Sequence, residues 1–294
     1  MSIRYNISRS IARLLPDKLY LSIKFHDRIG YWMDWKNPQT YNEKLQWLKL
    51  YNRRPEYTIM VDKVKVKEWV SKKIGEEYII PTLGVWKKAE EVDFNSLPQK
   101  FVIKCNHNSG TGMYICKDKS KMDEETVRGG LKKGLQENYI LQNREWPYKN
   151  ISRRILAEQY LEKPGKESLE DYKVMCFDGK ARLIELHEGR FTDNHTQAFY
   201  DRDWNLTNIS QVSYGKIVTK IVEPPKLLEE MICLSEVLAK DIPHVRVDWY
   251  IVNNHLFFGE MTFFDSSGFD EFIPNEYNII IGSWIKLPQK LSDK

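Results

Sequence analysis

A glycine-rich segment near the middle of the chain has residue types suited to holding an anion. Residues 108–112 read Asn-Ser-Gly-Thr-Gly and lie between two stretches, 101–104 and 113–116, that read as the strands of a hairpin. Glycines let the backbone approach a ligand closely, and a run of free N–H groups can cradle a phosphate. A glycine hairpin alone is more often only a turn. Lys104 favours a phosphate site, because a lysine that closes an apolar strand is costly unless its ammonium group reaches an anion.

Two acidic residues in the C-terminal part could hold a metal ion. Asp248 ends the stretch His-Val-Arg-Val-Asp, and Glu260 follows Leu-Phe-Phe-Gly. If residues 245–252 and 256–261 pair through an Asn-Asn turn at 253–254, Asp248 lies nearly opposite the glycine before Glu260, and the two carboxylates come close together. Mg²⁺ is commonly held by one or two carboxylates together with nucleotide phosphates.

The same carboxylates have a structural alternative. An unpaired carboxylate in an apolar strand is costly, so Asp248 could instead be neutralised by Arg246, and Glu260 by a lysine at the rim of the sheet. The residues alone leave the metal site and the salt bridges about equally open. The sequence shows no Ser/His/Asp or Cys/His arrangement typical of an enzyme with a protein nucleophile.

The elements that must position these residues predict an α+β fold built mainly from antiparallel hairpins. The first helix carries Ile3, Ile7 and Ile11 on one side and ends or kinks at Pro16. Thr40 is expected to cap the next helix, with Glu43 at the capping-box position. Further helices are expected over residues 60–75, about 123–141 and 226–240, and strands over residues 78–81, 84–86, 101–104, 113–116, 155–158, 171–177, 181–187, 245–252 and 256–261.

Charge is unevenly distributed along the chain. The net charge is only +4, yet residues 1–54 hold eleven Lys and Arg against four Asp and Glu, whereas residues 201–294 hold nine against fourteen. The first helix places Arg9 and Arg13 opposite its isoleucines. This basic front predicts a docking surface, an anionic acceptor or a peripheral membrane contact through residues 1–25.

Composition excludes several classes of protein. The mean hydropathy is −0.56, and no apolar run approaches the ~18 residues of a transmembrane helix. The start lacks the apolar core of a secretory signal. The four cysteines are scattered, which fits reduced thiols better than disulfides or a metal site. We therefore expect a cytoplasmic protein, with contact at the inner face of the membrane as an option.

Several motifs occur in an order that resembles the ATP-grasp superfamily. They are Asp62-Lys63 at the start of a helix, Lys104 before the glycine-rich hairpin, the connecting segment Ala-Glu-Gln-Tyr-Leu at 157–161, and Asp248 followed by Glu260. Other segments resemble more closely the TupA-like branch, which is associated with teichuronopeptide, capsule and other surface-polysaccharide biosynthesis. These segments are Asn-Glu-Lys-Leu-Gln-Trp-Leu at 42–48, Asp-Tyr-Lys-Val at 171–174, Phe-Tyr-Asp-Arg-Asp-Trp at 199–204 and Gly-Glu-Met-Thr-Phe-Phe at 259–264.

The resemblance covers residues 35–285 and implies an ATP-grasp fold, in which two α+β subdomains clasp ATP. A mainly helical region, 1–60, would stand in place of the Rossmann-like domain that precedes many such ligases. The ATP-grasp domain would span 61–294, with a glycine-loop subdomain at about 100–160 and a metal-binding subdomain at about 161–285.

The resemblance also implies roles for individual residues. Lys63 and Lys104 would hold the nucleotide phosphates, and Asp171 the ribose hydroxyls. The mobile loop over the phosphates would be Ser109, Gly110, Thr111 and Gly112, and the adenine hinge would be Glu158, Gln159, Tyr160 and Leu161. Asp248, Glu260 and Thr262 would carry Mg²⁺ or Mn²⁺, although Thr262 replaces the asparagine usual in the superfamily. Arg246 would face the transferred phosphate, and Lys173 and Arg190 would also serve catalysis.

The reaction implied is the ATP-dependent joining of a carboxylate to an amine or amino acid, through an acyl phosphate, with a sugar acid or polysaccharide as the carboxylate. His187, His195 and Arg190 could recognise the acceptor, or the histidines could be structural. The alternatives are an ATP-grasp kinase acting on a sugar hydroxyl, a carbohydrate- or nucleic-acid-binding module, and a glycosyltransferase. We expect no nucleic-acid partner.

Overall fold

The computed structural model describes residues 14–190, 192–214, 218 and 220–289, so the helix expected around Ile3, Ile7 and Ile11 lies outside the described residues. Among these described residues, four α-helices precede the first strand: α2 (Asp17–Ile29), α3 (Tyr41–Tyr51), α4 (Glu56–Val61) and α5 (Lys65–Ile74). The expected capping box is confirmed, because the Thr40 hydroxyl accepts from the Glu43 backbone and the Glu43 carboxylate accepts from the Thr40 backbone.

The expectation of one helix over 60–75 was wrong at its start. The helix is interrupted between α4 and α5, where Oδ1 of Asp62 accepts a hydrogen bond from the Val64 backbone N–H at 3.0 Å. An aspartate that bonds nearby backbone groups competes with the helix in this way. The helix then ends before Gly75, as expected.

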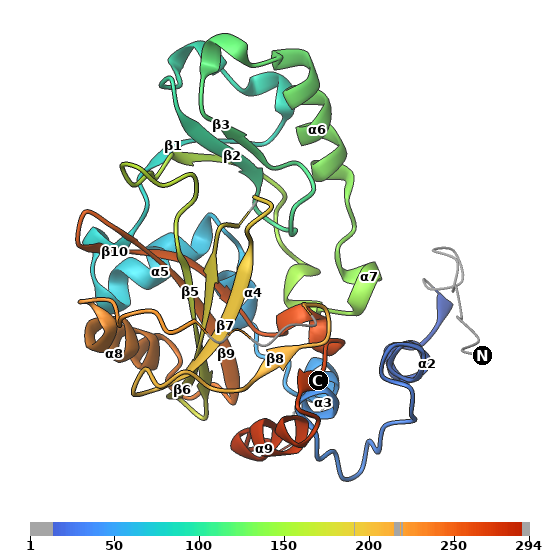
Figure 1. Cartoon of the computed structure of the whole chain (residues 1–294). Coiled ribbons are helices and arrows are strands. Elements are labelled where there is room, and N and C mark those ends of the chain that lie inside the picture. Colours follow the sequence, from blue (N-terminus) through green and yellow to red (C-terminus); the bar gives the residue numbers. More distant parts are fainter. Residues whose placement is uncertain (1–13, 191, 215–217, 219, 290–294) are drawn as a thin grey trace.

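A four-stranded antiparallel sheet forms the smaller lobe (Figure 1). Its strand order is β1-β4-β2-β3, from β1 (Thr82–Trp86), β2 (Phe101–Cys105), β3 (Tyr114–Cys116) and β4 (Ile155–Gln159). The expected pair of strands around the glycine-rich segment is present as β2 and β3. The helices expected around 123–141 are α6 (Glu124–Gln136) and α7 (Ile140–Asn143), and α6 covers the sheet with Val127 and Leu131.

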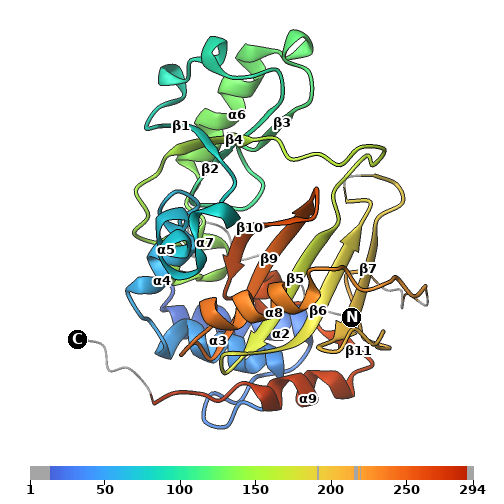
Figure 2. The same ribbon diagram turned by 90° about the vertical axis from the view of Figure 1, so that its left-hand side faces the viewer.

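A five-stranded antiparallel sheet forms the larger lobe (Figure 2). Its order is β10-β9-β5-β6-β7, from β10 (His255–Thr262), β9 (His244–Val252), β5 (Asp171–Phe177), β6 (Lys180–Glu188) and β7 (Thr196–Asp201). Two short strands, β8 (Ser210–Gln211) and β11 (Phe272–Ile273), pair beside it, and α8 (Leu228–Leu238) and α9 (Glu276–Trp284) follow β8 and β11. The chain is thus α+β, as the sequence predicts.

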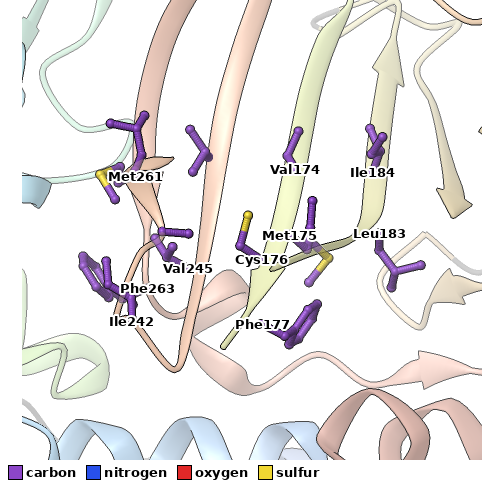
Figure 3. Close-up of a cluster of buried hydrophobic side chains, with 14 of the residues drawn as sticks. Val174, Met175, Cys176, Phe177, Leu183, Ile184, Ile242, Val245, Met261 and Phe263 are labelled. Carbon is purple, nitrogen blue, oxygen red and sulfur yellow. The ribbon is translucent and has the colours of Figure 1, made fainter. Parts of the chain in front are cut away.

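The large sheet has one apolar face and one polar face. Val174 and Cys176 of β5 and Val245 of β9 lie in the buried cluster shown in Figure 3, and α8 packs on β5, β6 and β9. Because side chains alternate across a strand, Arg246 and Asp248 of β9 point to the opposite face. That face is buried as well, so its charges need partners.

The β9–β10 hairpin brings the two expected metal carboxylates together. Asn253 and Asn254 both have positive φ, 51° and 58°, as a two-residue hairpin turn of this type requires. Trp249 pairs with Phe258 and Val247 with Met261, so a bulge formed by Gly259 and Glu260 lies opposite Asp248. Within the described residues, we find no helix whose length and apolar character would let it cross a membrane.

Candidate functional site

A row of charged side chains crosses the polar face of the large sheet. Asp248, Lys173 and Glu185 occupy paired positions on three adjacent strands, β9, β5 and β6. Nζ of Lys173 lies 2.6 Å from Oδ2 of Asp248 and 3.0 Å from Oδ2 of Asp171. Burial and the nearby Arg246 lower the pKa of Lys173, but the three carboxylates outweigh both and leave that pKa raised. Lys173 therefore stays an ammonium ion in the interior.

Arg246 is bound on several sides by carboxylates. Its Nε lies 2.7 Å from Oδ1 of Asp248 and its Nη2 lies 2.9 Å from Oδ2, a bidentate pair. Its Nη1 also pairs with Asp265 and lies 4.0 Å from Oε2 of Glu185. Burial lowers the pKa of Arg246, and these carboxylates raise it well above its usual value. The Asp248–Arg246 salt bridge proposed as the structural alternative is thus present, made by a residue that would also hold a metal.

Glu260 is held more loosely than Asp248. Its side chain is 40% exposed, and its oxygens lie 3.4 Å from Nζ of Lys63 and 3.8 Å from Nη2 of Arg246. The hydroxyl of Thr262, at 3.4 Å, is another distant neighbour. The expected Glu260–lysine pair is therefore also present, but it leaves the carboxylate open to a further ligand.

The donor set on these strands fits Mg²⁺ or Mn²⁺. Asp248, Glu260 and Thr262 offer only oxygen atoms, which hard cations prefer. Within the described ranges, no three His, Cys, Asp or Glu side chains form a ready-made metal site. Mg²⁺ is usually bound by one or two carboxylates plus substrate phosphates rather than by an all-protein cage. The residues therefore suit a cation that shares its ligands with phosphate.

Lys63 joins the two lobes. The break after α4 places its backbone N–H 3.2 Å from the Asn106 carbonyl, and Oδ1 of Asp62 accepts from Nδ2 of Asn106 at 2.8 Å. The Lys63 ammonium donates to the Asn108 carbonyl at 3.0 Å on one side and faces Glu260 on the other. The interruption between the helices thus positions a cation between the glycine-rich loop and the Glu260 carboxylate of β10.

Two lysines flank the carboxylate of Glu158, near the end of β4. The Glu158 carboxylate accepts from Nζ of Lys67 at 2.5 Å and pairs with Lys104 through its other oxygen. Burial raises the pKa of Glu158, but the two lysines lower it below its usual value. These three side chains and Lys63 line a pocket with Ile79, Ile80, Phe258 and others. Lys104 was expected to reach a phosphate beside the loop, and in this structure its ammonium pairs with the Glu158 carboxylate.

The hinge segment lies against the turn of the large sheet. Gln159, Tyr160 and Leu161 line a second pocket together with residues of the β9–β10 hairpin, which are Val252, Asn253, His255 and Phe257. The segment leads from β4 of the small lobe to β5 of the large lobe. Residues far apart in the sequence, at 159–161 and 252–257, therefore meet where the lobes join.

The glycine-rich loop is tied down at both ends and open in the middle. The Asn108 side chain donates to Oε2 of Glu137 at 2.8 Å. Gly112 has φ 73°, and a Cβ there would lie 2.9 Å from Sγ of Cys105 and 3.0 Å from Cα of Gly134. Gly110 also has positive φ, 85°, but faces open space, and both Ser109 and Gly110 are exposed. The loop can therefore meet a ligand through its middle residues.

Asp171 is buried rather than presented to a ligand. Its Oδ2 accepts from Nη1 of Arg190 at 2.6 Å and from Lys173, while its Oδ1 is buried without a hydrogen-bond partner. The Arg190 side chain is 43% exposed. The two residues expected at the ribose and in catalysis thus contact each other.

Three residues of this site were not predicted from the sequence. Lys67 could have been found, because four residues separate it from Lys63 in a segment that reads as a helix, which puts both on one side. Glu185 could also have been found, since Leu-Ile-Glu-Leu-His at 183–187 alternates polar and apolar residues on a strand. Asp265 gave no such signal, because it follows β10 in a short turn whose next two residues, Ser266 and Ser267, have positive φ, 44° and 55°.

Comparison with known proteins gives the fold a family. The profile of the family described as TupA-like ATPgrasp matches residues 43–286, and no curated protein matches the chain. Among solved structures, the chain is similar to D-alanine–D-alanine ligase from Bacillus anthracis complexed with ATP, with 18% identity, a TM-score of 0.41 and coverage of 69% of this chain and 53% of that one.

Two further structures show similar likeness. D-Alanine–D-alanine ligase from Helicobacter pylori gives 12% identity, a TM-score of 0.46 and coverage of 84% and 69%, and a RimK domain ATP-grasp protein from Sphaerobacter thermophilus gives 10%, 0.44, 80% and 70%. The chain spans about half the length of the Bacillus anthracis structure. The family profile covers most of the residues that build both sheets and the site between them. This chain therefore belongs to the TupA-like ATP-grasp family.

Proposed function

We propose that this chain is an ATP- and Mg²⁺-dependent ligase that joins a carboxylate to an amine through an acyl phosphate. One arrangement supports this most: Lys63 lies between the glycine-rich loop and Glu260, and Lys104 lines the same pocket. Lys63 thus faces a carboxylate of the large sheet from the junction of the two lobes, and Lys104 of the small lobe lines the pocket beside it. Phosphoryl transfer needs positive groups and a metal site together around the phosphates.

Each residue has a role in this scheme. Lys63 and Lys104 bind the nucleotide phosphates, and Arg246 and Lys173 stabilise negative charge that develops on the transferred phosphoryl group. Bound by Asp248, Glu260 and Thr262, Mg²⁺ or Mn²⁺ would neutralise further charge on the phosphate oxygens. The loop residues Ser109, Gly110, Thr111 and Gly112 cover the phosphates with their backbone N–H groups.

The other expected residues bind the nucleoside and the acceptor. The backbone of Glu158 to Leu161 contacts the adenine in the pocket beside the β9–β10 turn, and Asp171 binds the ribose once Arg190 has moved aside. Arg190, half-exposed at the mouth of the charged face, then meets an anionic substrate.

The chemistry needs no protein nucleophile. A carboxylate is a poor electrophile, and its phosphorylation by ATP gives an acyl phosphate whose carbonyl carbon an amine can attack. The amide forms as phosphate leaves. The resemblance to proteins of surface-polysaccharide biosynthesis suggests a sugar acid or polysaccharide as the carboxylate and an amino acid or amine as its partner. We further propose a cytoplasmic location, with peripheral membrane contact through residues 1–25.

A direct test supplies the purified chain with Mg²⁺, ATP, glucuronate and ethanolamine, and follows ADP release and product mass. We expect an amide, whereas a phosphorylated sugar would indicate the kinase alternative. Lys104→Met is expected to lose activity. Lys100→Met is its matched control, because Lys100 lies four residues earlier on the chain and pairs with the exposed Glu162, at 2.7 Å. No ATP turnover with any of a panel of sugar acids and amines would contradict the proposal.

A further inference from the structure

A histidine pair on the polar face of the large sheet has no part in binding the nucleotide or the cation. His187 lies on β6, and His195 immediately precedes β7. Nδ1 of His187 lies 2.8 Å from Nε2 of His195, and the rings stack with centroids 5.0 Å apart. Nε2 of His187 lies 2.6 Å from Oε1 of Glu185. Together the three residues, Glu185, His187 and His195, form a hydrogen-bonded relay of one carboxylate and two imidazoles.

The hydrogen bonds of this relay run in one direction, from His195 to Glu185. Burial raises the pKa of Glu185, but His187, Arg246 and Lys173 outweigh burial and lower it to about 2, so the carboxylate is ionised and only accepts. Nε2 of His187 then donates to Glu185, and the tautomer that leaves Nδ1 of His187 as an acceptor takes a hydrogen bond from Nε2 of His195. Nδ1 of His195 is left with a lone pair.

One end of the relay is buried and the other end is accessible to solvent. Glu185 and His187 are 3% and 4% exposed, whereas His195 is only half-buried. Gln197 fixes the inner end, because its amide donates to Oε1 of Glu185 at 2.6 Å. A base that must meet a substrate belongs at the accessible end, and that end is His195.

The buried end of the relay lies close to the proposed phosphoryl-transfer site. His187 pairs across the sheet with Asp171, and Lys173 joins Asp171 to Asp248. His187 lies two strands away from Asp248 and two residues further along the strand, which is about 12 Å at ~4.8 Å per strand and ~3.4 Å per residue. A carboxylate substrate held at the metal side of the face therefore extends toward the histidines.

We propose that His195 is the general base that takes a proton from the amine substrate, and that His187 and Glu185 are positioning residues that hold its tautomer. This assignment rests on the proposed ligase function. The amine arrives as an ammonium ion, and Nδ1 of His195 takes one proton. The freed lone pair then attacks the acyl carbon, a C–N bond forms, and the C–O bond breaks as phosphate leaves with the electron pair.

The remaining protons are accounted for as follows. The second proton of the nitrogen leaves with the departing phosphate. His195, now an imidazolium, is stabilised through His187 by the carboxylate of Glu185, and it returns its proton to solvent at the open end. General-base catalysis of this kind contributes roughly 10²–10⁴-fold to a rate.

The surroundings of His195 suit a neutral base. Burial, His187 and Arg190 lower its pKa below the usual histidine value, and Glu185 and Asp171 act in the opposite direction. The ring is thus largely unprotonated at neutral pH. The titratable and charged groups that face it are His187, Tyr214, Arg190, Glu185 and Asp171.

Two amines separate the base from the rest of the reaction. Hydroxylamine is mostly unprotonated at neutral pH and attacks an acyl phosphate without a base, whereas ethanolamine is protonated and needs one. With Mg²⁺, ATP and glucuronate, we expect His195→Gln to form the hydroxamate within about twofold of wild type, but the ethanolamide at least ~100-fold more slowly. His26→Gln is the control, because His26 stacks on Trp32 in the N-terminal helices, away from this face.

Three further results bear on the assignment. Added imidazole should restore amide formation in His195→Ala, which a structural role would not allow. Glu185→Gln should move the acidic limb of kcat/KM for ethanolamine to lower pH, because it removes a carboxylate that raises the pKa of His195. If wild type makes both products and His195→Gln loses both or neither, the assignment of the base is wrong and the ligase function stands. If wild type forms no hydroxamate with any of the panel of sugar acids, the ligase function fails, and the assignment fails with it.

Discussion

Replacing Lys173 with methionine should destabilise the protein strongly, because Lys173 neutralises two buried carboxylates. Its side chain is 6% exposed, and Asp171 and Asp248 are 2% and 4% exposed. Removing one partner of a buried ion pair costs about 3–5 kcal/mol, because the remaining charge stays in the interior without its partner. Arg246 still binds Asp248 and Arg190 still binds Asp171, so we expect the lower end, about 3 kcal/mol.

The measurement is the free energy of unfolding in urea, without nucleotide or metal. Lys180→Met is the matched control, since Lys180 lies on the neighbouring strand β6 and its ammonium, 2.9 Å from Glu236, belongs to a side chain that is 70% exposed. Exposed pairs contribute roughly 0–1 kcal/mol. Equal destabilisation by the two substitutions would refute the view that the charged row is a buried network.

A double substitution makes the test more specific. The double variant Lys173→Met with Asp171→Asn removes one of the two carboxylates that lose their partner. It should therefore be less destabilising than the sum of the two single substitutions. Couplings of about 0.5–3 kcal/mol are usual for residues in one network. Strict additivity would show that Lys173 and Asp171 do not interact.

Three further substitutions test local features. Burial lowers the pKa of His244 to about 3, so on acidification the unfolded protein takes up a proton at this histidine before the folded protein does. The free energy of unfolding should therefore fall below pH ~6.5, by about 2 kcal/mol at pH 5. In His244→Gln, the free energy of unfolding in urea should depend less on pH across that range. Gly112→Ala should cost about 1–3 kcal/mol more than Gly110→Ala by the same measurement, because both have positive φ but only Gly112 would clash. Thr40→Ala should lower the thermal midpoint through the loss of about 1 kcal/mol of capping.

Strands and turns were predicted well from the sequence because their signals are local. Residues 171–177 were expected as a strand and form β5 with the same bounds. The Asn253-Asn254 turn fixed the register that brings Asp248 near Glu260, since a two-residue turn determines which residues face each other. The bulge at Gly259 added only a small shift.

The helix boundaries and the partners of the charges were predicted less well. The break at Asp62 depends on Asn106, which is 44 residues away and donates to the Asp62 carboxylate. Pairing of Arg246 with Asp265 likewise depends on a turn that no periodicity marks. Such contacts are decided by tertiary packing, so the spacing argument identified the Asp248–Arg246 pair but not the partners that come from other segments, Lys173 and Asp265.

The ion-pair network also decides how kinetics at this site must be interpreted. Both oxygens of Asp248 are engaged by Arg246, and one also accepts from Lys173, so a cation that takes Asp248 as a ligand must share it with two positive side chains. Lys173→Met removes one of the two positive side chains that compete for Asp248, and with it a positive charge that the proposed mechanism places near the phosphates. Lys173→Arg keeps the charge, and a variant that regains stability without regaining turnover would separate the two contributions of this lysine.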